Sequence, residues 1–86
     1  MKICKEYKIC TDRGLAIVFD RTVNQGAAGC RSLINRIFKT KENKTVDEEL
    51  DLLYKVRDNW KKSNFIYKRI DDILKTSDFN NQQYIL

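Results

Sequence analysis

The first twenty residues alternate between apolar and polar positions in a way that is typical of strands. In residues 2–10 the apolar side holds Ile3, Tyr7 and Ile9. A period of two predicts a half-buried strand. Thr-Asp-Arg-Gly at residues 11–14 then predicts a turn, with Gly14 in its left-handed position, and residues 15–20 are apolar and partly β-branched. These patterns predict an N-terminal β-hairpin over residues 2–20.

The next segment changes to helical spacing. Its apolar positions recur at three- and four-residue steps, at Ala27, Cys30, Leu33, Ile34, Ile37 and Phe38. This spacing predicts an amphipathic helix over residues 26–40. An isolated hairpin is marginal in water, so we expect this helix to cover its apolar face. Residues 41–44 are expected to form a polar linker.

The second half of the chain has the pattern of one long or two shorter helices. Thr45-Val-Asp-Glu48 fits a capping box and predicts a helix that starts at Val46. The apolar 3-4 spacing then continues through residue 74. One unbroken helix would be about 46 Å long, longer than a compact domain of this size. A break near residues 61–64, with a second segment through about Lys75, is favoured, and an unbroken helix forming a homodimer through residues 46–76 is the alternative.

These elements predict one small α+β domain over residues 1–86. Its N-terminal β-hairpin would pack on a helix, and a long or broken helical segment would follow, in the order ββαα(α). Residues 84–86 are apolar and predict a short third strand on the hairpin, or a frayed end.

Positive charge is concentrated in the first half. The formal charge is +5, and residues 1–44 carry ten Lys and Arg against four acidic residues, whereas residues 45–86 carry seven against eight. A local excess of +6 attracts polyanions, meaning nucleic acid, an acidic membrane surface or an acidic protein. A basic surface that only keeps the protein in solution is the alternative interpretation.

The glycine pair at Gly26-Ala-Ala-Gly29, directly before the predicted helix, is the candidate site. Small residues let a phosphate approach the backbone, and a helix start presents free N–H groups to it. The predicted phosphate contacts are Arg21, Gly26, Gly29, Arg31, Arg36, Lys39 and Lys41. The spacing resembles the GxxG loop of the KH domain, which clamps nucleic-acid backbone. It differs in having alanines between the glycines, Ser32 where an aliphatic residue is expected, and a hairpin ahead of the loop, so no family is assigned.

Two further patterns have simpler interpretations. Cys30 and Arg36 have the Cys-x5-Arg spacing of cysteine phosphatases, yet no histidine precedes the cysteine and Leu33-Ile34 suits a continuous helix. A small buried cysteine is the favoured interpretation of Cys30. Tyr7 and Trp60 have basic neighbours and could stack unpaired bases, but both lie on apolar faces and are expected in the core.

Composition argues against an enzyme. The chain has no histidine, no recognisable nucleophile with a base, and an odd number of cysteines without a Cys-x-x-Cys pair. We expect no metal, no cofactor, no membrane span, no export signal and a reduced, cytoplasmic location, that of the host cell if the protein is viral.

Two functional hypotheses remain. The leading one is a non-enzymatic nucleic-acid-binding module, RNA before DNA. The alternative is an inhibitor of the kind made by phages or mobile elements, which binds a host protein, toxin or defence enzyme through an apolar surface. A phosphate contact should weaken steeply with salt, whereas an apolar protein interface should not.

Overall fold

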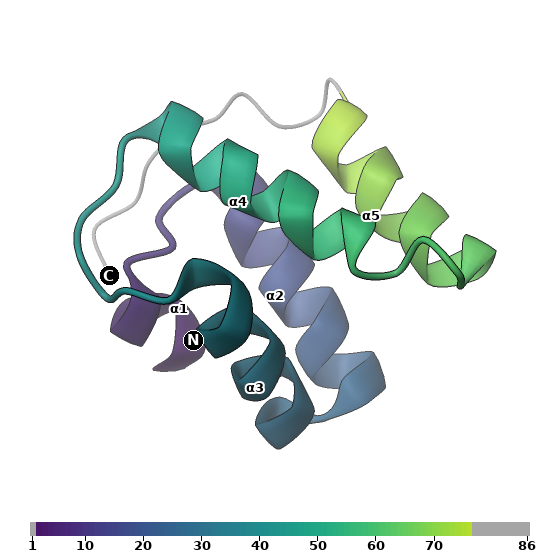
Figure 1. Ribbon diagram of the computed structural model, residues 1–86, viewed down its shortest axis with the longest axis horizontal. Coiled ribbons are helices and arrows are strands. Elements are labelled where there is room, and N and C mark those ends of the chain that lie inside the picture. Colours follow the sequence, from purple (N-terminus) through teal and green to yellow (C-terminus); the bar gives the residue numbers. More distant parts are fainter. Residues whose placement is uncertain (1, 77–86) are drawn as a thin grey trace.

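The structure is a computed structural model that describes residues 2–76. In this range the chain forms five α-helices and no strand (Figure 1). The helices are α1 (Lys2–Tyr7), α2 (Asp12–Gln25), α3 (Ala27–Phe38), α4 (Val46–Asp58) and α5 (Asn64–Lys75). Helix α2 packs against each of the other four, and α5 folds back against α4. The fold of the described range is therefore all-α, and the α+β prediction is wrong.

The predicted N-terminal hairpin is replaced by α1 and the first half of α2. Ile3 and Tyr7, taken as one side of a strand, are also four residues apart, and with Cys4 they form the buried face of α1. A short alternating window thus fits either period. Lys8 ends this helix with a φ of 60°, a left-handed conformation that no glycine signals.

The predicted turn at residues 11–14 is the start of α2. Thr11 is the N-cap, and its hydroxyl oxygen accepts a hydrogen bond from the N–H of Gly14 at 3.0 Å. Ile17 and Val18 are buried while the next residue, Phe19, is exposed, which is the pattern of a helix rather than a strand. The apolar run was interpreted as a strand because it holds β-branched residues, which favour strands. That preference is weak, and the packing of α2 on four other helices overrides it.

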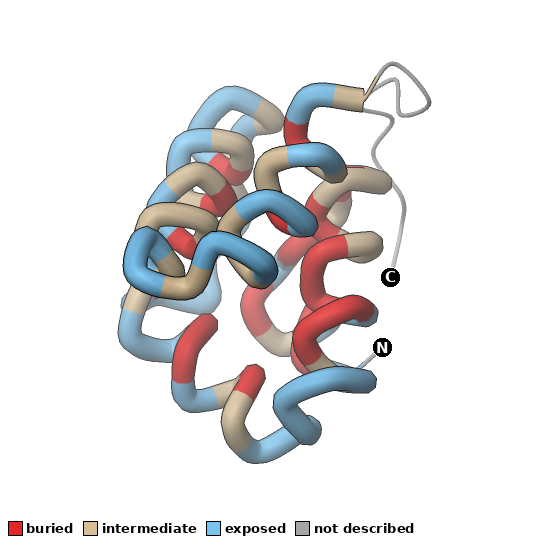
Figure 2. The backbone as a smooth tube through the Cα atoms, turned by 90° about the vertical axis from the view of Figure 1, so that its right-hand side faces the viewer, coloured by how far each residue is buried: buried red, intermediate tan, exposed pale blue. Residues whose placement is uncertain are grey.

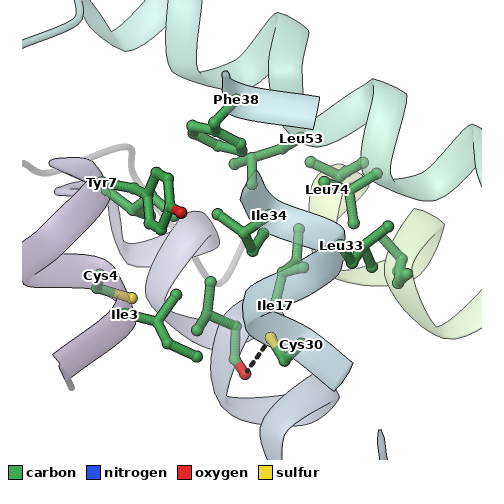
Figure 3. Close-up of a cluster of buried hydrophobic side chains, with 14 residues drawn as sticks. Ile3, Cys4, Tyr7, Ile17, Cys30, Leu33, Ile34, Phe38, Leu53 and Leu74 are labelled. Carbon is green, nitrogen blue, oxygen red and sulfur yellow. Dashed lines mark hydrogen bonds between the residues drawn. The ribbon is translucent and has the colours of Figure 1, made fainter. Parts of the chain in front are cut away.

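The core draws side chains from all five helices. Figure 2 marks the buried residues along the backbone in red, and Figure 3 draws the side chains of the core. Figure 3 shows them meeting around Ile34 of α3. The buried apolar residues of the helices are Ile3, Cys4, Tyr7, Ile17, Val18, Cys30, Leu33, Ile34, Phe38, Leu53, Val56, Ile70 and Leu74. The apolar spacing that predicted a helix over residues 26–40 thus marks the core-facing side of α3, apart from the exposed Ala27.

The second half forms two helices rather than one. The capping box is present: the Thr45 hydroxyl accepts from the Glu48 N–H, and the Glu48 carboxylate accepts from the Thr45 N–H. Helix α4 ends at Asp58 and α5 begins after Ser63, close to the expected break. The apolar residues of this segment, including Leu53 and Ile70, are buried inside the chain's own core. A homodimer through residues 46–76 stays a prediction.

Two expectations concern other parts of the chain. The predicted strand at residues 84–86 lies outside the described residues. No helix between residues 2 and 76 is both long enough and apolar enough to cross a membrane.

Candidate nucleic-acid interface

The glycine pair lies where α2 ends and α3 begins. Gly26 has a φ of 91°, a conformation that disfavours any side chain, and its N–H donates to the carbonyl of Thr22 at 3.0 Å. Ala27 and Ala28 are exposed, and no side chain caps α3. Gly29 belongs to the first turn of that helix. The Gly26 N–H is thus already used within α2, and contact of the following N–H groups with a phosphate stays a prediction.

Arg21 is not at this surface. Its side chain is almost fully buried, donates to the Asp20 carboxylate at 2.9 Å and lies over the ring of Trp60, 5.6 Å from its centre. Asp20 also accepts from Arg69 of α5. Arg21 therefore joins α2 to the turn after α4, and we assign it a structural role.

Arg36 and Lys39 lie at the far end of α3 from the glycines. Arg36 donates to the side-chain oxygen of Asn59 at 2.6 Å, and Lys39 ends the helix with a φ of 62°. Twelve residues of α-helix span about 18 Å. The predicted residues therefore do not form a single phosphate pocket with Gly26.

Arg31 and Lys41 do come together, and they meet at a carboxylate. Nη1 of Arg31 donates to both oxygens of Glu6, with a distance of 2.8 Å to Oε1. Nζ of Lys41 lies 3.4 Å from the same Oε1 atom, and 5.5 Å from the centre of the Tyr7 ring. Glu6 of α1 thus holds two of the predicted cations side by side.

A shallow hollow of about 380 Å³ opens beside this pair, lined by Lys2, Lys5, Glu6 and Arg31. We call these four residues together with Lys41 the α1–α3 groove. The groove holds four cations and one carboxylate, a local balance of +3, and two of the cations, Arg31 and Lys41, pair with that carboxylate. Lys2 and Lys5 are absent from the predicted contacts because the alternating pattern of residues 2–10 predicts a strand there. Helical spacing of three residues between them, on the same short helix, is the signal that would have found them.

The ion pairs inside the groove leave its cations available. Arg31 is 44% exposed and Glu6 25%, and pairs this close to solvent contribute about 1 kcal/mol or less. The guanidinium group has N–H donors beyond those on Nη1. Glu6 can therefore orient Arg31 while leaving it free to meet a phosphate.

Cys30 does not form a phosphatase loop with Arg36. Its thiol is fully buried and donates weakly to the carbonyl of Val18 at 3.8 Å (Figure 3), and burial raises its pKa. Residues 30–36 form a continuous stretch of α3. A protonated thiol in the core cannot serve as a nucleophile, which matches the favoured interpretation of a small core residue.

The two aromatic residues with basic neighbours also face inward. Tyr7 is 3% exposed, and its hydroxyl donates to the side-chain oxygen of Asn35 at 2.8 Å. Trp60 packs against the core beneath Arg21. Neither ring is presented to a base.

Neither a metal-binding cluster among the described residues nor a relative points to a further site. Within residues 2–76 no three His, Cys, Asp or Glu side chains lie together so that they could hold a metal ion. Comparisons with known protein families, with curated proteins and with solved structures gave no match.

Proposed function

We propose that the protein is a small non-enzymatic nucleic-acid-binding module that contacts phosphates through the α1–α3 groove. The observation that carries the proposal is that Lys2, Lys5 and Arg31 line one hollow with Glu6, whose carboxylate also pairs with Lys41. Three cations that line one hollow, with a fourth paired to the same carboxylate, provide the sequence-independent attraction that dominates nucleic-acid binding.

The form of the groove supports contact with a backbone rather than with a small molecule. It is a surface hollow of about 380 Å³, whereas ligand pockets usually enclose most of a ligand. Arg31 supplies a planar fork of donors, which suits phosphate oxygens, and the lysines supply mobile point charges.

RNA is proposed before DNA because of the helices that form the groove. Helix α1 has only six residues, and α3 is packed against α1, α2 and α4. Neither helix projects into a major groove in the way that recognition helices of DNA-binding domains do. We also propose a cytoplasmic location, since the three cysteines are free thiols.

Fluorescence anisotropy with a labelled 20-nucleotide RNA tests the proposal. We expect the affinity to fall steeply between about 50 and 200 mM salt. The double variant Lys2→Glu/Lys5→Glu should bind at least tenfold more weakly and show a shallower salt dependence, because it removes two of the four groove cations.

The matched control is Lys55→Glu/Lys75→Glu, which makes the same change of charge on α4 and α5, away from the groove. It should lose much less affinity than the groove variant, and circular dichroism should show both variants folded. Equal losses in the two variants would mean that only net charge matters. Absence of RNA binding by the wild-type protein would reject the function.

A further inference from the structure

A second surface, on α2 and α5, presents apolar side chains to solvent. Among the described residues the large hydrophobic side chains that are exposed are Phe19 (61%), Val23 (65%) and Phe65 (71%). Phe19 and Val23 are one turn apart on α2, and Phe65 lies in the first turn of α5. None of the three is used by the α1–α3 groove.

The register of the two helices brings Val23 and Phe65 to the same end, with Phe19 one turn before Val23 on α2. Arg13 of α2 donates to the carbonyl of Thr76 at 2.9 Å, and Asp20 accepts from Arg69. Residue numbers on α5 therefore fall as those on α2 rise, so the helices are antiparallel, as Figure 1 also shows. The same register places Phe65 level with Asn24, the residue that follows Val23 in α2.

Cations border this surface, which we call the α2–α5 aromatic face and define as Phe19, Val23 and Phe65. The guanidinium of Arg69 lies over the Phe65 ring, 5.7 Å from its centre. Lys62 and Lys68 are exposed on either side of Phe65 in the sequence. The carboxylate of Asp20 is paired with both Arg21 and Arg69 and offsets one of their two charges, whereas Lys62 and Lys68 add two more. The net charge of the groups that border the α2–α5 aromatic face is therefore positive.

The size of the face decides which class of partner fits it. Three partly exposed side chains present a few hundred Å² at most, less than the roughly 800 Å² that each partner of a specific protein complex buries. Stacking needs less area, because one ring accommodates one base, and each stacked base contributes enough to change affinity severalfold or more. Arginine beside an aromatic ring adds a second planar surface.

We propose that the α2–α5 aromatic face binds unpaired bases of single-stranded nucleic acid, with Phe65 and Phe19 as stacking surfaces and the bordering cations near the phosphates. This inference rests on the proposed function and adds to it a preference for single strands over duplexes. Bases in a duplex are already stacked on one another and cannot reach the two rings.

The test uses labelled oligo(U) of 20 nucleotides and a labelled RNA duplex of 20 base pairs, each measured by anisotropy. The double variant Phe19→Leu/Phe65→Leu keeps apolar side chains but removes both rings. Because both positions are exposed, the variant should fold normally. We expect its affinity for oligo(U) to fall about tenfold or more, with duplex binding unchanged.

The outcomes separate the two proposals. If Lys2→Glu/Lys5→Glu weakens both probes while Phe19→Leu/Phe65→Leu changes neither, the groove function stands and stacking is rejected. If the wild-type protein binds neither probe, the function itself is rejected. A concentration-dependent dimer in sedimentation that the Leu variant abolishes would assign the face to a second copy of the chain and overturn the inference.

Discussion

The backbone N–H of Thr11 donates to Oε2 of Glu49 at 3.0 Å, joining the start of α2 to α4. The Thr11 hydroxyl donates to the same oxygen, and the N–H of Cys10 donates to Oε1 at 2.8 Å. Glu49 is 1% exposed. One buried carboxylate thus satisfies the polar backbone of the turn between α1 and α2, and holds that turn against α4.

We expect Glu49→Gln to lower the free energy of unfolding by about 2 kcal/mol, because a neutral amide offers one acceptor where the carboxylate offers two. Urea denaturation measures this change. Asp51→Asn is the control, since Asp51 is on the same helix but exposed, and it should change stability little. Equal effects in the two variants would contradict the role assigned to Glu49.

The second prediction concerns the substitution of Gly14 in α2. Alanine normally stabilises a helix interior over glycine by about 1 kcal/mol. A Cβ atom at Gly14, however, would lie 2.5 Å from Oε2 of Glu49 and 2.5 Å from Cγ2 of Ile9. We therefore expect Gly14→Ala to destabilise the protein, by about 1–3 kcal/mol.

Gly29→Ala is its matched control on α3. There the nearest contact of the new Cβ would be Cγ of Gln25 at 3.0 Å, on an exposed side chain that can move. Thermal unfolding should show Gly14→Ala below the wild type and Gly29→Ala equal to it or above. A stabilising Gly14→Ala would show that α2 and α4 pack less closely at this point than described.

The lowered pKa of Asp71 predicts that the stability of the fold depends on pH in the acid range. Burial favours its protonated form, but hydrogen bonds from Arg57 at 2.7 Å and from Lys75 outweigh burial and lower its pKa. A carboxyl group with a lowered pKa stabilises the fold above its unfolded pKa, near 3.9, and that contribution is lost as the pH falls through the folded pKa.

The stability difference between wild type and Asp71→Asn should therefore be largest near neutral pH and shrink below about pH 4. Urea denaturation at a series of pH values measures it. Asp72→Asn, an exposed neighbour with the same change of charge, is the control and should show a smaller difference. A difference that stays constant with pH would mean that the asparagine acts through packing rather than through charge.

The three cysteines should differ in reactivity. Cys4 and Cys30 are fully buried, and burial raises the pKa of Cys4 to about 12 and that of Cys30 as well. Cys10 is partly exposed. A chromogenic disulfide reagent at pH 8 should modify one thiol in the native protein and three in denaturant, with mass spectrometry locating the first at Cys10. Fast modification of Cys30 would contradict its placement in the core.

Local signals account for what could be predicted in the second half of the chain. The Thr45–Glu48 capping box is a contact between residues three apart, so it can be recognised without knowing the fold. The spacing of Leu33 and Ile34 marks the buried side of α3 for the same reason. The sequence also indicated that a helix would break near residue 63, since one rod would exceed the size of the domain.

The first half shows where local patterns are insufficient. Ile3 and Tyr7 fit a strand and a helix equally well, and packing against α2 and α3 decides for the helix. Glu49 is one of the acidic residues in the first turn of α4, and only the approach of Thr11, 38 residues away, makes it a buried acceptor.

The same distinction between local pattern and packing applies to the candidate site. The sequence by itself determined that positive charge lies in the first half and that α3 carries Arg31 on its polar side. Only the tertiary structure decided that Arg31 lines a hollow with Lys2 and Lys5 and shares Glu6 with Lys41, while Arg21 is buried elsewhere. The physical reason is that a charge acts over the few ångströms around it, and which charges lie that close is set by how the helices pack, not by their order in the chain.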